Sequence, residues 1–370
     1  MPKAGKVSTE ENASARKSTV GGFLLSHTLT SRRFWKMPEP KSRKPGLPVT
    51  IEDRLRGAIW GQFVGDAAAL GTLWIYDLDE LGRKFPGGVN GFEQPQKGHY
   101  HFPRQAGDQT HYGDGALVLL ESIADRGRFE VKDFSRRFVE TFQPGIYSGY
   151  IDHATKETLE NYSRSVERNP KAEFNFQNGA DDDQLGTAAR LASLVVHNYR
   201  DPDLLSLVES ATRVSQNNPV AIACMKFNAL LLLELFEGKE VPAAVRDVEE
   251  RVGLMGFGPE VCKKSQAARE ADQEEVVKAT LAFGQSCPLE HSFPSALQAF
   301  LKYPDDFETS ILATIRAGGD SAGRAAMLGA WLGAHLGLEA IPEEWCQRLR
   351  YAERISRAVE KILREVDSRQ

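Results

Sequence analysis

Apolar residues recur at spacings of three and four through most of the chain from residue 51 onward. These spacings place side chains on one face of an α-helix, and good helix formers occupy the positions between them. Segments of alternating β-branched residues are nearly absent, so the pattern predicts an all-α fold. The predicted helices span about residues 117–127, 131–142, 183–198, 203–214, 218–236, 241–253, 259–284, 292–302, 306–316, 321–337 and 343–366.

Two stretches interrupt this pattern, at about residues 76–115 and 143–182. Both contain Gly, Pro, Asp and aromatic residues, and we expect long loops of the kind that carry functional sites. Asp203 and Pro342 are of the residue types that begin helices. The longest apolar run, residues 229–233, is too short to span a membrane and predicts a buried helix.

The first 50 residues differ in composition from the rest of the chain. They carry ten Lys or Arg and three Glu, a net charge of +7 in a chain whose total is −5. Their short apolar patch, residues 22–25, cannot bury enough surface to offset the entropy lost on ordering. The sequence therefore predicts a disordered basic leader over residues 1–48 and a folded domain over residues 49–370. An export or organelle-targeting signal is the alternative interpretation of the leader.

The overall composition restricts the partners and the compartment. The net charge of −5 and the pI near 6 argue against nucleic-acid binding. The four cysteines are widely spaced without a C-x-x-C pair, which is typical of unpaired thiols in a reducing compartment. We therefore expect a cytoplasmic protein with neither a nucleic-acid nor a membrane partner.

Glycines recur at every fourth position in two predicted helices. They are Gly57, Gly61 and Gly65 near one end of the chain and Gly329, Gly333 and Gly337 near the other. A glycine inside a helix costs about 1 kcal/mol relative to alanine. Six tolerated glycines therefore predict two central helices whose backbones approach closely, with Asp66 and Asp320 brought toward one place.

Acidic residues gather in three stretches of small and polar residues, 107–115, 181–190 and 317–324. Each stretch places an acid at a predicted helix start, and the first directly precedes a helix expected to begin near Ala116. Such acids can cap the helix N-terminus. Alternatively, carboxylates that converge from several helix ends supply the oxygen ligands that Mg²⁺ requires.

Histidine side chains are further candidates for functional groups. His111 lies in the first acidic stretch and is a candidate general acid or base; a loop histidine bonded to backbone is the alternative. His153 directly precedes a predicted helix, and its side chain is a candidate for lining a binding pocket. His99 and His101 are expected at the surface. The chain has no recognisable Ser-His-Asp arrangement, phosphate-binding loop or dinucleotide-binding glycine motif.

Three blocks resemble the ADP-ribosylglycohydrolase family, in the order that the family has them. Residues 54–67 resemble its opening helix with a Gly-Asp-Ala turn, residues 181–194 its central segment, and residues 317–345 its closing Gly-Gly-Asp helix with a Gly-Leu-Glu-Ala-Ile-Pro-Glu-x-Trp tail. Residues 74–77, 112–114 and 151–156 are similar to a branch that includes a lens crystallin. The resemblance implies a single large orthogonal helical bundle.

The resemblance also implies a reaction and a cofactor. Family members hydrolyse the glycosidic bond that joins ADP-ribose to a protein side chain or small molecule, with two Mg²⁺ ions orienting the ribose and polarising water. The two metal-binding blocks of the family align with residues 113–116 and 320–323, where only Asp114 and Asp320 remain as ligands of the family type. This incomplete set predicts one Mg²⁺ ion or none.

The resulting hypothesis is an ADP-ribosyl hydrolase that acts on ADP-ribose or an ADP-ribosylated protein. A catalytically weak relative that binds ADP-ribose or a partner protein, or has a structural role, is the alternative. Asp114, Asp320 and His111 are the predicted catalytic residues, with Asp114 and Asp320 also the predicted metal ligands. The predicted ligand-binding residues are Asp66, Asp108, Thr110, Gly113, Asp183, Thr187, Arg190, His153, Gly318, Gly319 and Ser321.

Overall fold

The computed structural model describes residues 48–368, so the predicted leader lies almost wholly outside the described residues. Within that range the chain forms helices and no strand, which confirms the all-α prediction. The longer helices are α1 (Ile51–Ala69), α2 (Leu78–Lys84), α3 (His111–Arg126), α4 (Val131–Phe142), α5 (His153–Arg168), α6 (Ala192–His197), α7 (Leu204–Arg213), α8 (Pro219–Phe236), α9 (Val241–Val252), α10 (Gly258–Glu270), α11 (Val276–Phe283), α12 (Leu289–Lys302), α13 (Phe307–Arg316), α14 (Ser321–Leu336), α15 (Glu343–Arg348) and α16 (Ala352–Ser368). Four short 3₁₀ helices are η1 (Leu70–Thr72), η2 (Phe176–Asn178), η3 (Ala188–Arg190) and η4 (Leu338–Ala340).

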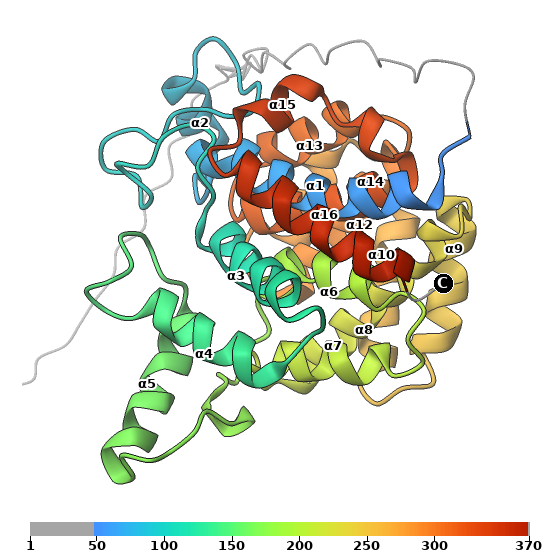
Figure 1. Cartoon of the computed structure of the whole chain (residues 1–370). Coiled ribbons are helices and arrows are strands. Elements are labelled where there is room, and N and C mark those ends of the chain that lie inside the picture. The colour runs from blue at the N-terminus through green and yellow to red at the C-terminus, as the bar shows by residue number, and fades with distance from the viewer. Residues whose placement is uncertain (1–47, 369–370) are drawn as a thin grey trace, which may run out of the picture. The chain divides into compact units, whose positions relative to one another are not determined.

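The central pair of helices is α1 and α14, which lie side by side in Figure 1. Their backbones touch along the glycine stripes. A Cβ atom built on Gly61 would lie 2.0 Å from the carbonyl oxygen of Gly329, and one on Gly57 would lie 2.2 Å from that of Gly333. These distances are far below van der Waals contact, so only glycine fits there. The predicted close approach of the two helices is confirmed.

Helices α3, α6, α8, α12 and α13 pack on one or both members of this pair. Helix α16 packs on α3, while α12 packs on α10, α11, α13 and α14. Helix α8 contains the longest apolar run and packs on α7, α9, α10 and α14. It is long and apolar enough to cross a membrane, but 67% of its residues are buried inside the protein. The prediction of a buried helix at this position is therefore confirmed.

Several predicted helix boundaries are wrong. Helix α3 begins at His111 instead of near Ala116, because Thr110 caps it by accepting a hydrogen bond from the backbone N–H of Tyr112. Of the predicted helix 183–198, the residues up to Thr187 are irregular and the rest form η3 and α6. The predicted helices 259–284 and 343–366 are each split in two, and the expected loops 76–115 and 143–182 contain α2 and α5.

Candidate functional site

The first part of the candidate site joins α1 to the start of α3. Asp66 is fully buried near the end of α1 and accepts two hydrogen bonds from Thr110, one from its backbone N–H at 2.7 Å and one from its hydroxyl at 2.5 Å. Burial raises the pKa of Asp66 to about 7, although the bonds from Thr110 oppose the shift. A Cβ atom on Gly113 would lie 2.3 Å from the Asp66 carboxylate, so the missing side chain leaves room for it.

The second part surrounds Asp114, in the first turn of α3. Its Oδ2 atom accepts a hydrogen bond from Arg104 at 2.7 Å and another from the Tyr147 hydroxyl at 2.6 Å. Arg104 also donates to the same hydroxyl at 2.8 Å, which closes a triangle of three side chains. Burial alone would lower the pKa of Arg104, but Asp114 and Tyr147 outweigh it and keep the guanidinium charged.

The third part is built around Asp320, which directly precedes α14. Gly318 and Gly319 adopt φ angles of 70° and 65°, and Gly319 exchanges backbone hydrogen bonds with residues 74 and 75. After this turn Asp320 lies in the interior, where its Oδ2 atom accepts a hydrogen bond from the Tyr112 hydroxyl at 2.8 Å. Among the described residues its Oδ1 atom has no hydrogen-bond partner. Asp320 therefore keeps one buried carboxylate oxygen available.

His111 lies beside a buried carboxylate that the sequence analysis did not select. Its Nε2 atom is 3.6 Å from Asp152 Oδ2, and its ring lies 3.9 Å from that of Tyr112 between centroids. Burial alone would raise the pKa of Asp152, but contacts with His111 and Thr155 outweigh it and lower the pKa to about 2. His111 thus has an ionised partner that can orient its imidazole.

Aromatic rings lie against these groups. His101 stacks on His111 with a centroid distance of 5.6 Å, and both rings also lie near Trp74 and Tyr150. The predicted surface position of His101 is wrong, because only 1% of the residue is exposed. Burial also lowers the pKa of His101 to about 2, so its ring is neutral near pH 7.

The other predicted residues lie at different places. Thr187 and Arg190 form a buried network in which Arg190 donates to the Thr187 hydroxyl at 3.0 Å and Thr187 donates to Gln216 at 2.8 Å. Asp108 accepts hydrogen bonds from Arg350 and from the backbone of residue 105. Asp183 is half-buried, and Ser321 is buried with an unpartnered hydroxyl among the described residues. The His153 side chain is 68% exposed and lies 3.3 Å from Asp182.

The side chains present do not fit a pair of Mg²⁺ ions. Within residues 48–368, no three His, Cys, Asp or Glu side chains gather as a metal site would require. Asp114 already faces the guanidinium of Arg104 and the hydroxyl of Tyr147. Since Mg²⁺ takes six oxygen ligands at close range, a guanidinium at this carboxylate competes directly with it. The role of Asp114 and Asp320 as Mg²⁺ ligands therefore stays a prediction from the sequence.

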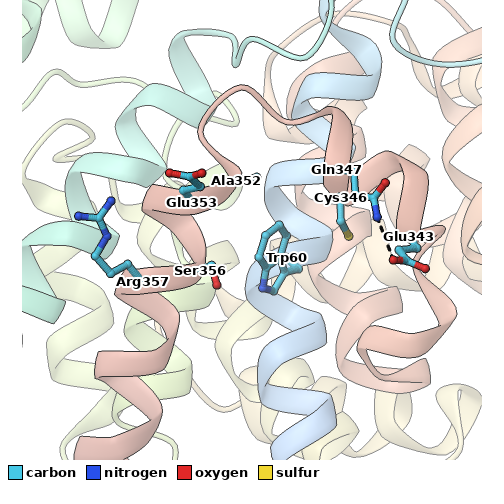
Figure 2. A pocket seen from close by; sticks show the side chains of 8 residues that line it. All are labelled: Trp60, Glu343, Cys346, Gln347, Ala352, Glu353, Ser356 and Arg357. Carbon is cyan, nitrogen blue, oxygen red and sulfur yellow. Dashed lines mark hydrogen bonds between the residues drawn. The ribbon is translucent and has the colours of Figure 1, made fainter.

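A separate groove lies between α1, α15 and α16, with a volume of about 560 Å³ (Figure 2). Trp60 of α1 lies in the middle of the groove, and Glu353, Ser356 and Arg357 of α16 line one side. Gln347 donates to Glu343 at 2.8 Å on the opposite side. None of the predicted site residues lines this groove, so it is distinct from the candidate site.

Comparison with known proteins identifies the family. The family model described as ADP-ribosylglycohydrolase matches residues 47–370. The chain belongs to the ADP-ribosylglycohydrolase family. A solved structure described as an ADP-ribosylglycohydrolase-related protein complex matches with a TM-score of 0.62 and 25% identity, covering 85% of this chain and 98% of its own. The family fold inferred from the three sequence blocks is therefore confirmed.

Individual members of the family differ in their described roles. Crystallin J1A of Tripedalia cystophora is 26% identical over 84% of this chain and 98% of its own length. The ADP-ribosylarginine hydrolase Tri1 of Serratia proteamaculans is 24% identical over 84% of this chain and 79% of its own. The ADP-ribosyl-[dinitrogen reductase] glycohydrolase of Rhodospirillum rubrum is 24% identical over 85% and 97%. This family member thus has relatives named as enzymes and relatives named as crystallins.

Proposed function

We propose that the protein hydrolyses the glycosidic bond between ADP-ribose and a protein side chain. The observation that carries the proposal is the buried, half-satisfied carboxylate of Asp320, which accepts a hydrogen bond from Tyr112. The ring of Tyr112 in turn lies against His111 of the His111–Asp152 pair. Cleavage of a glycosidic bond develops positive charge on the sugar ring, and a nearby carboxylate stabilises that charge. Relatives named as hydrolases of ADP-ribosylated proteins support the same reaction class.

His111 is the proposed general base. Asp152 faces its Nε2 atom, so the tautomer protonated at Nε2 leaves Nδ1 free to take a proton from water. That water attacks the anomeric carbon as the bond to the side chain breaks, and the departing group regains a proton from solvent or from His111. Tyr112 holds the Asp320 carboxylate in place through its hydroxyl.

Binding of ADP-ribose without turnover is the second candidate function. It is favoured by Asp114, whose Oδ2 atom is occupied by Arg104 and Tyr147. The similarity to crystallin J1A points in the same direction. In this case the buried polar groups bind and orient the nucleotide, and no bond is cleaved.

One experiment separates the two functions. The full chain is incubated with an arginine-ADP-ribosylated protein, release of ADP-ribose is measured, and binding of free ADP-ribose is followed by calorimetry. The proposal expects release that falls at least about 100-fold in Asp320→Asn and in His111→Gln, as removal of a base or a charge-stabilising group generally costs. Arg357→Ala, in the separate groove, is the control and should keep full activity. Binding with no release establishes the second function, and the absence of both contradicts each.

A further inference from the structure

A buried arginine contacts Asp114, one of the two residues that the family resemblance implies as metal ligands. The side chains of Arg104 and Asp114 are only 14% and 13% exposed. The Arg104 guanidinium contacts Asp114, the Tyr147 hydroxyl and the backbone oxygen of Gln109. Asp114 Oδ2 thus has a cationic donor at 2.7 Å and a hydroxyl donor at 2.6 Å. The two donors therefore surround the negatively charged carboxylate of Asp114.

The surroundings fix the arginine at this place. The backbone N–H of Arg104 donates to the carbonyl oxygen of His101 at 2.8 Å, and its own carbonyl accepts from Gln94 at 2.6 Å. A Cβ atom on Gly149 would lie 2.7 Å from Arg104 Nη2, so glycine leaves the room that the guanidinium fills. The guanidinium carbon lies 5.4 Å from the centre of the Tyr147 ring. Arg104 is therefore a built-in part of the site.

A cation beside Asp114 relieves a local charge repulsion. Asp66 and Asp114 both adjoin the first turn of α3, and their carboxylates repel each other whenever Asp66 is ionised. In metal-dependent sites a divalent ion offsets such repulsion between carboxylates. A guanidinium does the same with a single permanent charge, because it stays protonated at every pH of interest.

We propose that Arg104 is an internal cation that replaces the divalent metal at Asp114, so that the site assembles without Mg²⁺. The inference concerns assembly of the site and does not depend on whether the protein hydrolyses ADP-ribose. A failure of the hydrolase proposal would leave it intact. Conversely, a metal requirement would overturn it even if hydrolysis were observed.

The test follows Mn²⁺ binding by paramagnetic resonance and thermal stability with Mg²⁺ or EDTA, on the full chain. The wild type should show no bound Mn²⁺ at Asp114 and the same melting temperature in both buffers. Arg104→Ala leaves two neighbouring carboxylates without a cation. It should melt at a lower temperature in EDTA, regain part of the loss in millimolar Mg²⁺, and bind Mn²⁺ at least about tenfold more tightly than the wild type.

Two controls make the result specific. Arg350→Ala also removes an arginine from a buried carboxylate, that of Asp108, but should gain no Mn²⁺ binding. Arg104→Ala combined with Asp114→Asn should lose the gain seen in Arg104→Ala alone. If Arg104→Ala does not fold, Arg104→Lys retains the charge and should fold with the same indifference to EDTA. Stoichiometric Mn²⁺ binding by the wild type that Asp114→Asn abolishes would overturn the proposal, as would metal-dependent folding of Arg104→Lys.

Discussion

Gly113 lies where the first turn of α3 meets the carboxylate of Asp66. A Cβ atom there would be 2.3 Å from the carboxylate and 2.2 Å from the side-chain amide of Gln109. Gly113→Ala should therefore destabilise the protein by about 1–3 kcal/mol through overpacking, as measured by urea unfolding. Gly115→Ala is the matched control, because its Cβ atom would meet nothing nearer than 3.8 Å. Equal stability of the two variants would contradict this account of the contact.

Asp66 should also make the stability of the protein depend on pH. Its pKa is raised to about 7 in the folded state, so folding favours the protonated form. This contribution is fully present below the ordinary pKa of about 4 and is lost as the pH rises through 7. The stability of the wild type should fall by about 2–3 kcal/mol between pH 5 and pH 8 relative to Asp66→Asn. Parallel pH profiles of the two proteins in urea unfolding would argue against a buried, protonated Asp66.

At this scale the sequence identified only part of the candidate site. Asp66 and Asp320 each directly follow a glycine near a helix end, and Thr110 directly precedes a helix, so these positions can be recognised without a structure. Arg104 and Tyr147 come from non-periodic loops, and their roles depend on how those loops cross α3. Asp152 could have been found, because it stands as a capping residue directly before α5.

At the scale of the elements, the pairing of α1 with α14 depends on backbone contact. Gly61→Ala should already destabilise the protein by about 1–3 kcal/mol, because its Cβ atom would lie 2.0 Å from a carbonyl oxygen of α14. Gly82→Ala in α2 is the control, since nothing lies within 4 Å of its Cβ position, and it should be neutral or slightly stabilising. Thermal melting of both variants is the measurement. A wild-type melting temperature for Gly61→Ala would refute the close packing of α1 on α14.

Most helices could be predicted from the sequence, whereas α2, α5 and many helix boundaries could not. The glycine stripes predict the close approach of α1 and α14, and the apolar run predicts the buried helix α8. Both patterns lie within a few consecutive turns of the chain. Residues 183–187 are of helix-compatible types, yet they form an irregular segment. Their backbone groups make hydrogen bonds with buried side chains instead of with each other. Gln216, for example, accepts from the backbone of Thr187 at 2.7 Å and donates to the carbonyl of Gln184 at 2.6 Å. Such tertiary competition is invisible to periodicity.

At the scale of the whole molecule, the family match begins at residue 47, close to the boundary predicted from charge and composition. Residues 1–45 lack a core-forming pattern, and we expect them to be dispensable for folding. Limited proteolysis should trim the chain to about residues 45–51, and the trimmed protein should melt at the same temperature as the full chain. Protection of the leader, or a clear drop in the melting temperature after its removal, would contradict the prediction.

The contact of α1 with α14 also determines when this domain can be completed during protein synthesis. Arg54 of α1 donates a hydrogen bond to the carbonyl of Ala334, 280 residues further along the chain. A ribosome adds roughly 5–20 residues per second, so α1 waits about 15–60 s for its partner helix to be made. During that interval the glycine face of α1 lacks its native cover, and apolar surface beside it is open to other nascent chains. We therefore expect chaperones that hold early segments to raise the yield of folded protein.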